Sequence, residues 1–223
     1  MNDTLYRAAR LLGSPFAYRC AGLVHIGKGP AIYVANHLGP VGPIQVMLAL
    51  PVRLYPWILA ETIDPRLAGQ RIYRDLVRPV WGLHGRLGRA LGEIIAWPGV
   101  RFLWGLGCIA IDREHEQYMA AFRRSLALLR QGKSLLIFPE DERRPLDPAT
   151  GMRPFLCGFL LLCSLYERET GAPLPIYPVA VSSERREVSI GKAIFLEPAS
   201  RRDGILRTGD RLYEDIARLW AGL

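Results

Sequence analysis

The sequence has few cysteines and none in a metal-binding arrangement. Its four cysteines include no Cys-x-x-Cys pair, so we expect no zinc site, and no other metal is expected. All four stand among apolar neighbours, and we interpret them as reduced core residues. Reduced thiols are typical of a cytoplasmic protein. The residues in question are Cys20, Cys108, Cys157 and Cys163.

The sequence also lacks a long uninterrupted hydrophobic run. Its longest uncharged stretch, residues 29–52, contains four prolines together with Asn36 and His37, which does not fit a membrane-spanning helix. The N-terminus has no apolar signal-peptide segment, because Asp3, Arg7 and Arg10 interrupt it. We therefore expect a cytoplasmic protein that is soluble or bound peripherally to a membrane.

Acidic residues are too few to balance the basic ones. The chain has 29 Lys and Arg against 21 Asp and Glu, a formal charge of +8. Such an excess favours an anionic partner, which includes nucleic acid, an acidic membrane surface and a phosphorylated substrate. The arginines are spread along the chain, and no nucleic-acid-binding motif is found. We expect no nucleic-acid partner.

Length and patterning predict one α/β domain over residues 1–223. Half of the residues are hydrophobic, enough for a sizeable core. Apolar runs alternate with amphipathic stretches, which predicts a single mixed β-sheet flanked by helices. Strands are expected at residues 23–26, 31–34, 52–60, 108–111, 134–138 and 175–181, with a hairpin of 187–190 and 193–196. Helices are expected within the N-terminal residues 1–20 and at 43–50, 65–77, 79–97, 116–130, 154–168 and 204–219.

Residues 62–98 form an inserted basic helical segment in this scheme. Arginines alternate there with leucine, valine, isoleucine and tryptophan. A cationic, tryptophan-bearing helix pair can face an acidic membrane surface. The same pattern also fits a pair of surface helices with a solvated basic face, and the pattern alone does not choose between them.

Two apolar runs end in polar residues that can carry chemistry. Residues 31–35 lead to Asn36 and His37, and residues 134–138 lead, after a proline, to an acidic and then basic group. A neutral imidazole accepts a proton near pH 7 and can return it. The planar arginine fork suits phosphate, and we expect Glu140 to pair with Arg143 and aim it. The full second group is Glu140, Asp141, Glu142, Arg143 and Arg144.

Less specific interpretations of both groups remain open. Taken alone, His37 fits better a buried histidine bonded to the backbone, and the second group also fits a solvated charged loop. A divalent metal on the three carboxylates is a weaker alternative, because neighbouring side chains of an extended segment diverge.

Four blocks, taken in order, resemble the glycerophospholipid acyltransferase superfamily, which includes 1-acylglycerol-3-phosphate acyltransferases. The first block of that family is Asn-His, four residues and Asp, and the second is Gly-x-Ile-x-Ile-Asp-Arg. The third is Phe-Pro-Glu-Gly-Thr-Arg-Ser, and the fourth is an apolar Pro-Val strand. The corresponding residues here are 36–42, 107–113, 138–144 and 176–181.

The resemblance implies an acyltransferase fold and a function. His37 would take a proton from an acceptor hydroxyl, which then attacks the thioester of acyl-CoA or acyl carrier protein. No cofactor is implied beyond that thioester donor, and the acceptor would be a lipid or phospholipid. Residues of the four blocks would bind the substrates: Asn36, Arg113, Glu140, Arg143, Arg144 and Pro178.

The chain departs from the family pattern at specific positions. The family's Asp, which orients the His, is replaced by Gly42, and Asp141 and Glu142 replace Gly and Thr. We hypothesise that Glu61 or Glu140 orients His37 instead. The alternative is a catalytically impaired relative that binds lipid or acyl groups.

Overall fold

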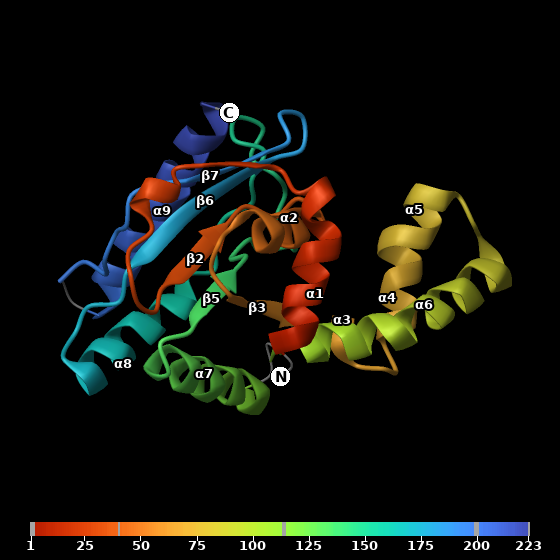
Figure 1. The fold of residues 1–223 in the computed structure, drawn as a ribbon, viewed down its shortest axis with the longest axis horizontal. Helices are drawn as coiled ribbons and strands as arrows, with labels where there is room; N and C mark the ends of the chain where they lie inside the picture. Colours follow the sequence, from red (N-terminus) through yellow and green to blue (C-terminus); the bar gives the residue numbers. More distant parts are fainter. Residues whose placement is uncertain (1–2, 40, 113–114, 199–200, 223) are drawn as a thin grey trace. The chain divides into compact units, whose positions relative to one another are not determined.

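The computed structural model describes residues 3–39, 41–112, 115–198 and 201–222. Strands in these residues form one sheet in the order β1-β7-β6-β2-β5-β3-β4, with helices flanking it (Figure 1). This mixed α/β architecture confirms the predicted fold class. The strands are β1 (Arg19–Ala21), β2 (Ile32–Ala35), β3 (Leu54–Leu59), β4 (Ile109–Ile111), β5 (Ser134–Ile137), β6 (Ile176–Ser182) and β7 (Glu187–Ile190).

The α-helices begin with α1 (Asp3–Gly13), which confirms the expected N-terminal helix. The others are α2 (Val41–Ala49), α3 (Ala60–Ile63), α4 (Ala68–Ile72), α5 (Arg78–Trp81), α6 (Gly85–Leu106), α7 (His115–Arg130), α8 (Leu161–Thr170) and α9 (Arg201–Ala221). Short 3₁₀ turns are η1 (Ser14–Phe16), η2 (Leu23–His25) and η4 (Cys157–Leu160), and η3 (Tyr73–Val77) is a π-helical turn. Among the residues described, none of these helices has the length and apolarity needed to cross a bilayer.

The chain divides into two compact units. The smaller unit comprises Met1–Ala9 and Pro56–Ala121, and the larger unit comprises Arg10–Tyr55 and Phe122–Leu223. The smaller unit therefore contains the whole predicted insert, residues 62–98. The larger unit contains both polar blocks singled out above, which follow β2 and β5.

In the larger unit β2 lies between β5 and β6 and runs parallel to both (Figure 1). Val34 is paired with Ile137 of β5 and with Pro178 of β6. Because parallel strands end at the same edge of a sheet, the residues that follow β2 and β5 meet there. This edge positions the candidate site.

The two faces of this sheet are covered by different helices. On one face Tyr33 and Tyr177 stack with their ring centroids 5.0 Å apart. Val46 of α2 and Leu50, the residue after that helix, belong to the same core cluster. Successive side chains of a strand point to opposite faces, so Pro178 points the other way. A Cβ on Gly191 would touch the Pro178 ring and Leu219 of α9, which places α9 on that second face.

Two predicted strands are wrong. Residues 23–26 form the turn η2, because Gly22, with a φ of +77°, reverses the chain directly after β1. Residues 193–196 form no hairpin with β7. Both edges of β7 are already occupied, by antiparallel β6 and parallel β1, and Ile194 makes only a single bridge to Ile176.

Two predicted helices have the wrong bounds. The helix expected at 154–168 begins as the 3₁₀ turn η4 at Cys157 and becomes the α-helix α8 only at Leu161. It cannot start earlier because Phe155 pairs with Glu140 in an isolated antiparallel bridge. The helix expected at 79–97 is α6, which begins at Gly85 and continues through Pro98 to Leu106. Proline removes one helical hydrogen bond, and here both Pro98 and Ile94, four residues earlier, are exposed to water.

All four cysteines are free. Cys108 and Cys163 are buried, whereas Cys20 and Cys157 are half-buried. Burial raises the pKa of the Cys20 thiol from 9.0 to about 11, with a smaller contribution from Glu187. At neutral pH the Cys20 thiol is therefore protonated and a weak nucleophile.

Candidate active site

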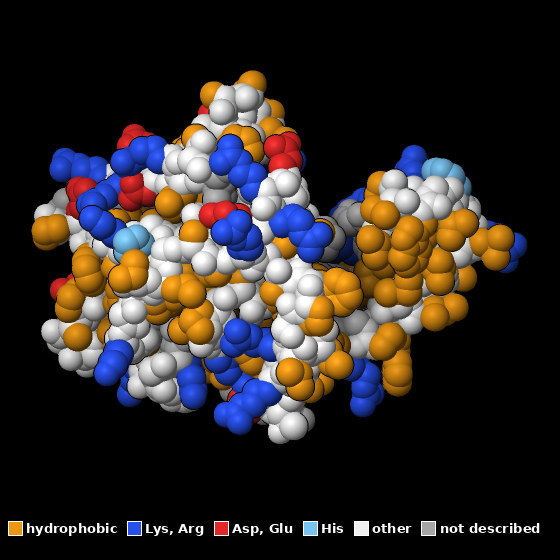
Figure 2. All heavy atoms as spheres, turned by 45° about the horizontal axis from the view of Figure 1, so that its top comes forward, with side chains coloured by type: hydrophobic (Ala, Val, Ile, Leu, Met, Phe, Trp, Pro, Cys, Tyr) orange, Lys and Arg blue, Asp and Glu red, His pale blue; other side chains and the backbone are white. Residues whose placement is uncertain are grey.

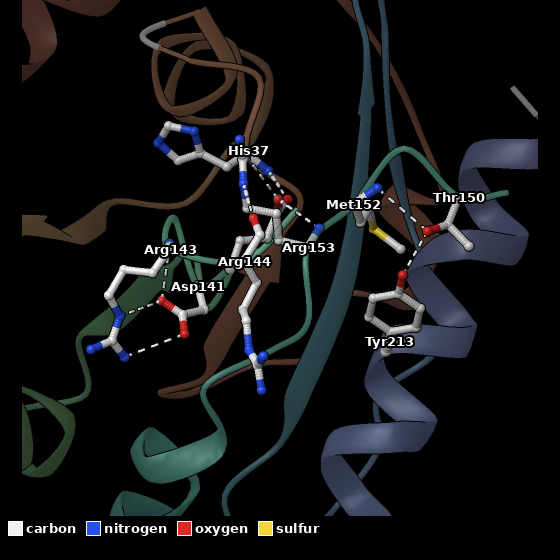
Figure 3. A network of polar contacts seen from close by, with 9 residues as sticks. His37, Asp141, Arg143, Arg144, Thr150, Met152, Arg153 and Tyr213 are labelled. Atoms are coloured by element: carbon white, nitrogen blue, oxygen red, sulfur yellow. Dashed lines mark hydrogen bonds and ion pairs between the residues drawn. The ribbon is translucent and has the colours of Figure 1, made fainter. Parts of the chain in front are cut away.

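His37 and Glu140 meet at the edge of the sheet where β2 and β5 end. The backbone N–H of His37 donates a 2.7 Å hydrogen bond to Oε1 of Glu140, within the network drawn in Figure 3. The two polar blocks therefore come together at one edge of the sheet.

Glu140 is a buried carboxylate, 7% exposed, that joins two segments of the larger unit. Its Oε1 accepts from His37, and its Oε2 accepts from the backbone N–H of Arg153 at 3.1 Å. The Arg153 guanidinium lies 4.0 Å from the same Oε2. A buried charge is costly unless it is paired and hydrogen-bonded, and these contacts satisfy both of its oxygens. Glu140 thus fixes the backbone of His37.

A short antiparallel ribbon brings Arg153 to Glu140. The N–H of Asp141 donates to the carbonyl of Pro154 at 2.9 Å, and that of Leu156 donates to the carbonyl of Pro139 at 2.8 Å. Nε of Arg153 also donates to the Arg144 carbonyl at 2.9 Å. Sequence reasoning missed Arg153, because it belongs to no motif and only the pairing of residues 139–141 with 154–156 carries it to the site.

Asn36 is buried, and its side-chain amide makes two hydrogen bonds to the backbone of one residue of β6. Its Nδ2 donates to the Val181 carbonyl at 3.1 Å, and its Oδ1 accepts from the Val181 N–H at 2.7 Å. The side chain therefore continues the β2–β6 ladder one step beyond the strand. Its observed role is to anchor the chain immediately before His37.

The imidazole of His37 is half-buried and is directed away from Arg153 (Figure 3). It packs edge-on against Phe138, with ring centroids 5.5 Å apart. The nearby Gly42 lies in the first turn of α2. A Cβ added there would sit 3.5 Å from the Leu38 Cβ and 3.7 Å from the Asn36 carbonyl oxygen. Position 42 thus faces the loop that carries His37, and a Cβ there would make ordinary van der Waals contacts.

Arg143 pairs with Asp141, so the predicted pair between Glu140 and Arg143 is wrong. Nε of Arg143 lies 3.0 Å from Oδ1, and Nη2 lies 3.3 Å from Oδ2. Glu140 is unavailable because its oxygens are held by two backbone N–H groups. The hydrogen bond to Asp141 raises the pKa of the Arg143 guanidinium, and the negative charge of Asp141 acts in the same direction. The Arg143 side chain remains 68% exposed.

Two further predicted residues, Arg144 and Pro178, occupy separate places. Arg144 is exposed, and its carbonyl accepts the bond from Arg153. Pro178 is buried in β6, where its carbonyl accepts from the Gly191 N–H at 2.8 Å. Arg113 lies outside the described residues.

Glu61 belongs to the smaller unit. It lies in α3, and its carboxylate forms a 3.3 Å ion pair with Nη1 of Arg71. The hypothesis that Glu61 orients His37 stays a prediction.

Tyr213 of α9 supports the loop that leads to Arg153. Its hydroxyl lies 2.6 Å from Oγ1 of Thr150 (Figure 3). It also donates to Oδ2 of Asp147 at 3.2 Å. Burial raises the pKa of Tyr213, and the charges of Asp147 and Glu140 act in the same direction, while the Thr150 contact lowers it. Among the described residues, no group of three His, Cys, Asp or Glu side chains is arranged to hold a metal ion.

Comparisons with known proteins bear on the architecture. No family model matches the sequence, and no curated protein sequence matches it. A solved structure of the 1-acyl-sn-glycerophosphate (LPA) acyltransferase PlsC from Thermotoga maritima is similar, with a TM-score of 0.59 and 15% identity. The likeness covers 96% of this chain and 77% of that chain. The chain therefore has an acyltransferase-like fold.

Proposed function

We propose that the chain is an acyltransferase that moves a fatty acyl group from a thioester to a hydroxyl of a lipid-like acceptor. One observation carries the proposal: His37 follows the central strand β2, and the buried carboxylate of Glu140 fixes its backbone. A histidine held in this way at the carboxyl edge of the strands stands where open α/β sheets place their reacting groups. The fold shared with an acyltransferase supports the same proposal.

In the proposed reaction the imidazole of His37 takes the proton of the acceptor hydroxyl. The hydroxyl oxygen attacks the thioester carbonyl carbon, and the tetrahedral intermediate collapses with cleavage of the carbon–sulfur bond. The leaving thiolate takes back the proton from the imidazolium. The histidine ends as it began, as a general acid–base catalyst does.

The arginines that follow β5 are proposed to bind an anionic acceptor. Arg143 is exposed, and its pairing with Asp141 restricts the guanidinium while N–H groups remain on its other edge. Arg144 is exposed beside it. Arg113 would assist, as the family pattern implies. The donor is proposed to be acyl-CoA or acyl carrier protein, both of which are anionic and suit a chain of charge +8.

The test is an assay of the purified chain with radiolabelled acyl-CoA and, separately, labelled acyl carrier protein. Each donor is offered 1-acylglycerol-3-phosphate, other lysophospholipids and glycerol 3-phosphate, and labelled lipid is separated from unreacted donor. We expect one donor–acceptor pair to yield labelled product. The absence of product from every pair, with protein shown to be folded, would overturn the proposal.

A second candidate is a catalytically impaired relative that binds lipid or acyl groups. The observation that favours it is Gly42, which leaves position 42 without the carboxylate of the family pattern. Retained binding of a lysophospholipid with no turnover, in the same assay, is the outcome expected of this candidate.

A further inference from the structure

The smaller unit carries large apolar side chains on its surface. On α6, Leu87 is 81% exposed, Ile94 69% and Trp97 68%. Figure 2 shows hydrophobic side chains gathered over the part of the molecule formed by α4, α5 and α6. We call the following set the outer face: Val80, Trp81, Leu83, Leu87, Ile94 and Trp97. Contiguous apolar surface of this kind marks an interaction site.

The outer face exists because α6 packs inward through small residues. Gly88, Gly92 and Ala96 are buried at a spacing of four residues. A Cβ on Gly92 would lie 2.6 Å from the carbonyl oxygen of Gly69 in α4, so the two backbones approach closely. A helix that buries small residues leaves its large apolar ones outside. Helices in water usually do the opposite, whereas helices that pack among lipids use small residues at their contacts.

The charge of this segment indicates what covers the outer face. Residues 66–106 contain seven arginines and two acids, Asp75 and Glu93, for a net charge of +5. Arg78, Arg86 and Arg89 are exposed close in sequence to the apolar residues. Anionic headgroups are complementary to such a charge, and the long arginine stems can lie along an apolar surface with their heads in water.

A second copy of the chain fits this surface poorly. A two-fold dimer through the outer face would bring the same patch of each copy together. The arginines around it would then oppose arginines of like charge, which costs free energy. An acidic bilayer surface has no such conflict.

We infer that the outer face binds the surface of an acidic phospholipid bilayer, with α6 lying in the interface. Trp97 suits this position, because an indole favours the boundary between headgroups and acyl chains. Its ring is covered by the guanidinium of Arg101, 5.0 Å from the ring centroid. The inference depends on the smaller unit alone and stands whether or not His37 is catalytic.

The test is co-sedimentation of the full chain with vesicles of phosphatidylglycerol and phosphatidylcholine, or of phosphatidylcholine alone. Ile94→Gln/Trp97→Gln removes apolar area from the outer face. Its matched control, Leu206→Gln/Trp220→Gln, makes the same two chemical changes at exposed positions of α9. All four side chains are exposed, so folding should persist in both, and circular dichroism checks this.

Charge is tested separately with Arg86→Gln/Arg89→Gln. The control is Arg202→Gln/Arg207→Gln, at exposed positions of α9. Arg86→Gln/Arg89→Gln should weaken binding to phosphatidylglycerol vesicles. At high salt this variant and the wild type should bind equally, because salt screens the attraction between the arginines and the headgroups. The α9 pair should change binding much less.

We expect the wild type to bind the acidic vesicles, and Ile94→Gln/Trp97→Gln to lower its partition coefficient by about tenfold or more. The α9 control should change it by less than about twofold. Three results would overturn the inference. The first is no vesicle binding by the wild type, and the second is an equal loss of vesicle binding in Ile94→Gln/Trp97→Gln and in its α9 control. The third is a dimer in solution that only Ile94→Gln/Trp97→Gln dissociates. None of these outcomes bears on acyl transfer, so the two proposals fail separately.

Discussion

The backbone N–H of His37 and the carboxylate of Glu140 are joined by a 2.7 Å hydrogen bond between groups 103 residues apart in the chain. The bond links the ends of two adjacent parallel strands, β2 and β5. The second oxygen of the same carboxylate accepts from Arg153. One buried side chain therefore holds both segments, and the predicted effects of changing it are large.

Glu140→Gln should destabilise the chain by about 1–3 kcal/mol, because one backbone N–H then faces an amide N–H₂ in place of an acceptor. Urea unfolding measures the change. Glu142→Gln, two residues on and at an exposed position, is the control and should shift the free energy of unfolding by less than about 0.5 kcal/mol. Equal effects of the two substitutions would contradict this account of Glu140.

Gly42→Asp should raise the rate of acyl transfer. The added carboxylate would project from the first turn of α2 toward the His37 loop, where a Cβ has room. Loss of the orienting carboxylate costs about 10⁴ in turnover in an analogous triad, so we expect a gain of at least about tenfold. The measurement is the initial rate with the best donor–acceptor pair. Gly42→Asn, of the same size and uncharged, is the control, and an equal rise in both would show that charge is not the cause.

Replacing two glycines of α6 by alanine should change the stability of the chain in opposite directions. Gly92→Ala forces a Cβ to within 2.6 Å of a backbone oxygen and should destabilise the chain by about 1–3 kcal/mol. Gly99→Ala meets nothing within 4 Å and should stabilise it by about 0.5–1 kcal/mol through helix propensity. Thermal unfolding of both variants checks the prediction. A loss of stability in Gly99→Ala equal to that in Gly92→Ala would contradict the close packing of α6 on α4.

Stability should fall at alkaline pH because of a buried thiol. Burial raises the pKa of Cys163 from 9.0 to about 12, and Glu167 adds to the effect. The folded state then holds its proton more tightly than the unfolded chain, so this stabilisation is complete below pH 9.0 and is lost as pH rises toward about 12. The expected slope above pH 9.0 is up to about 1.4 kcal/mol per pH unit.

Urea unfolding between about pH 8 and about pH 10.5 measures that slope. Cys163→Ala removes the thiol and should give a shallower fall, although it is less stable at neutral pH because of the cavity it leaves. The same slope in both proteins would assign the alkaline loss to other groups.

The sheet could be predicted from the sequence because its strands are continuous apolar runs. Residues 31–35 and 134–137 are buried along their whole length, and such runs leave little choice of structure. Their parallel pairing then dictated that His37 and Glu140 meet. The mistaken strand at 23–26 had similar residues but follows a glycine that turns the chain, and that turn depends on close approach to β7.

The finer geometry of the site depended on contacts that no local pattern contains. Three acids precede Arg143 within three residues, and the two backbone N–H groups that hold the oxygens of Glu140 exclude Glu140 as its partner. Arg153 reaches the site through a short antiparallel ribbon that pairs residues 139–141 with residues 154–156. Helix α5 ends just before Gly82, which adopts a left-handed conformation with a φ of +65°. Helix α6 continues through Pro98, where both Pro98 and Ile94 are exposed to water.

The most direct test of the account is the initial rate of acyl transfer by the wild type and by His37→Gln, measured with the same labelled donor and acceptor. Thermal unfolding must show that both proteins are folded. We predict that the wild type forms labelled lipid and that His37→Gln lowers the rate by about 10²-fold or more, the share typical of a general base. Transfer that continues undiminished in His37→Gln would contradict the proposed catalytic role of this histidine.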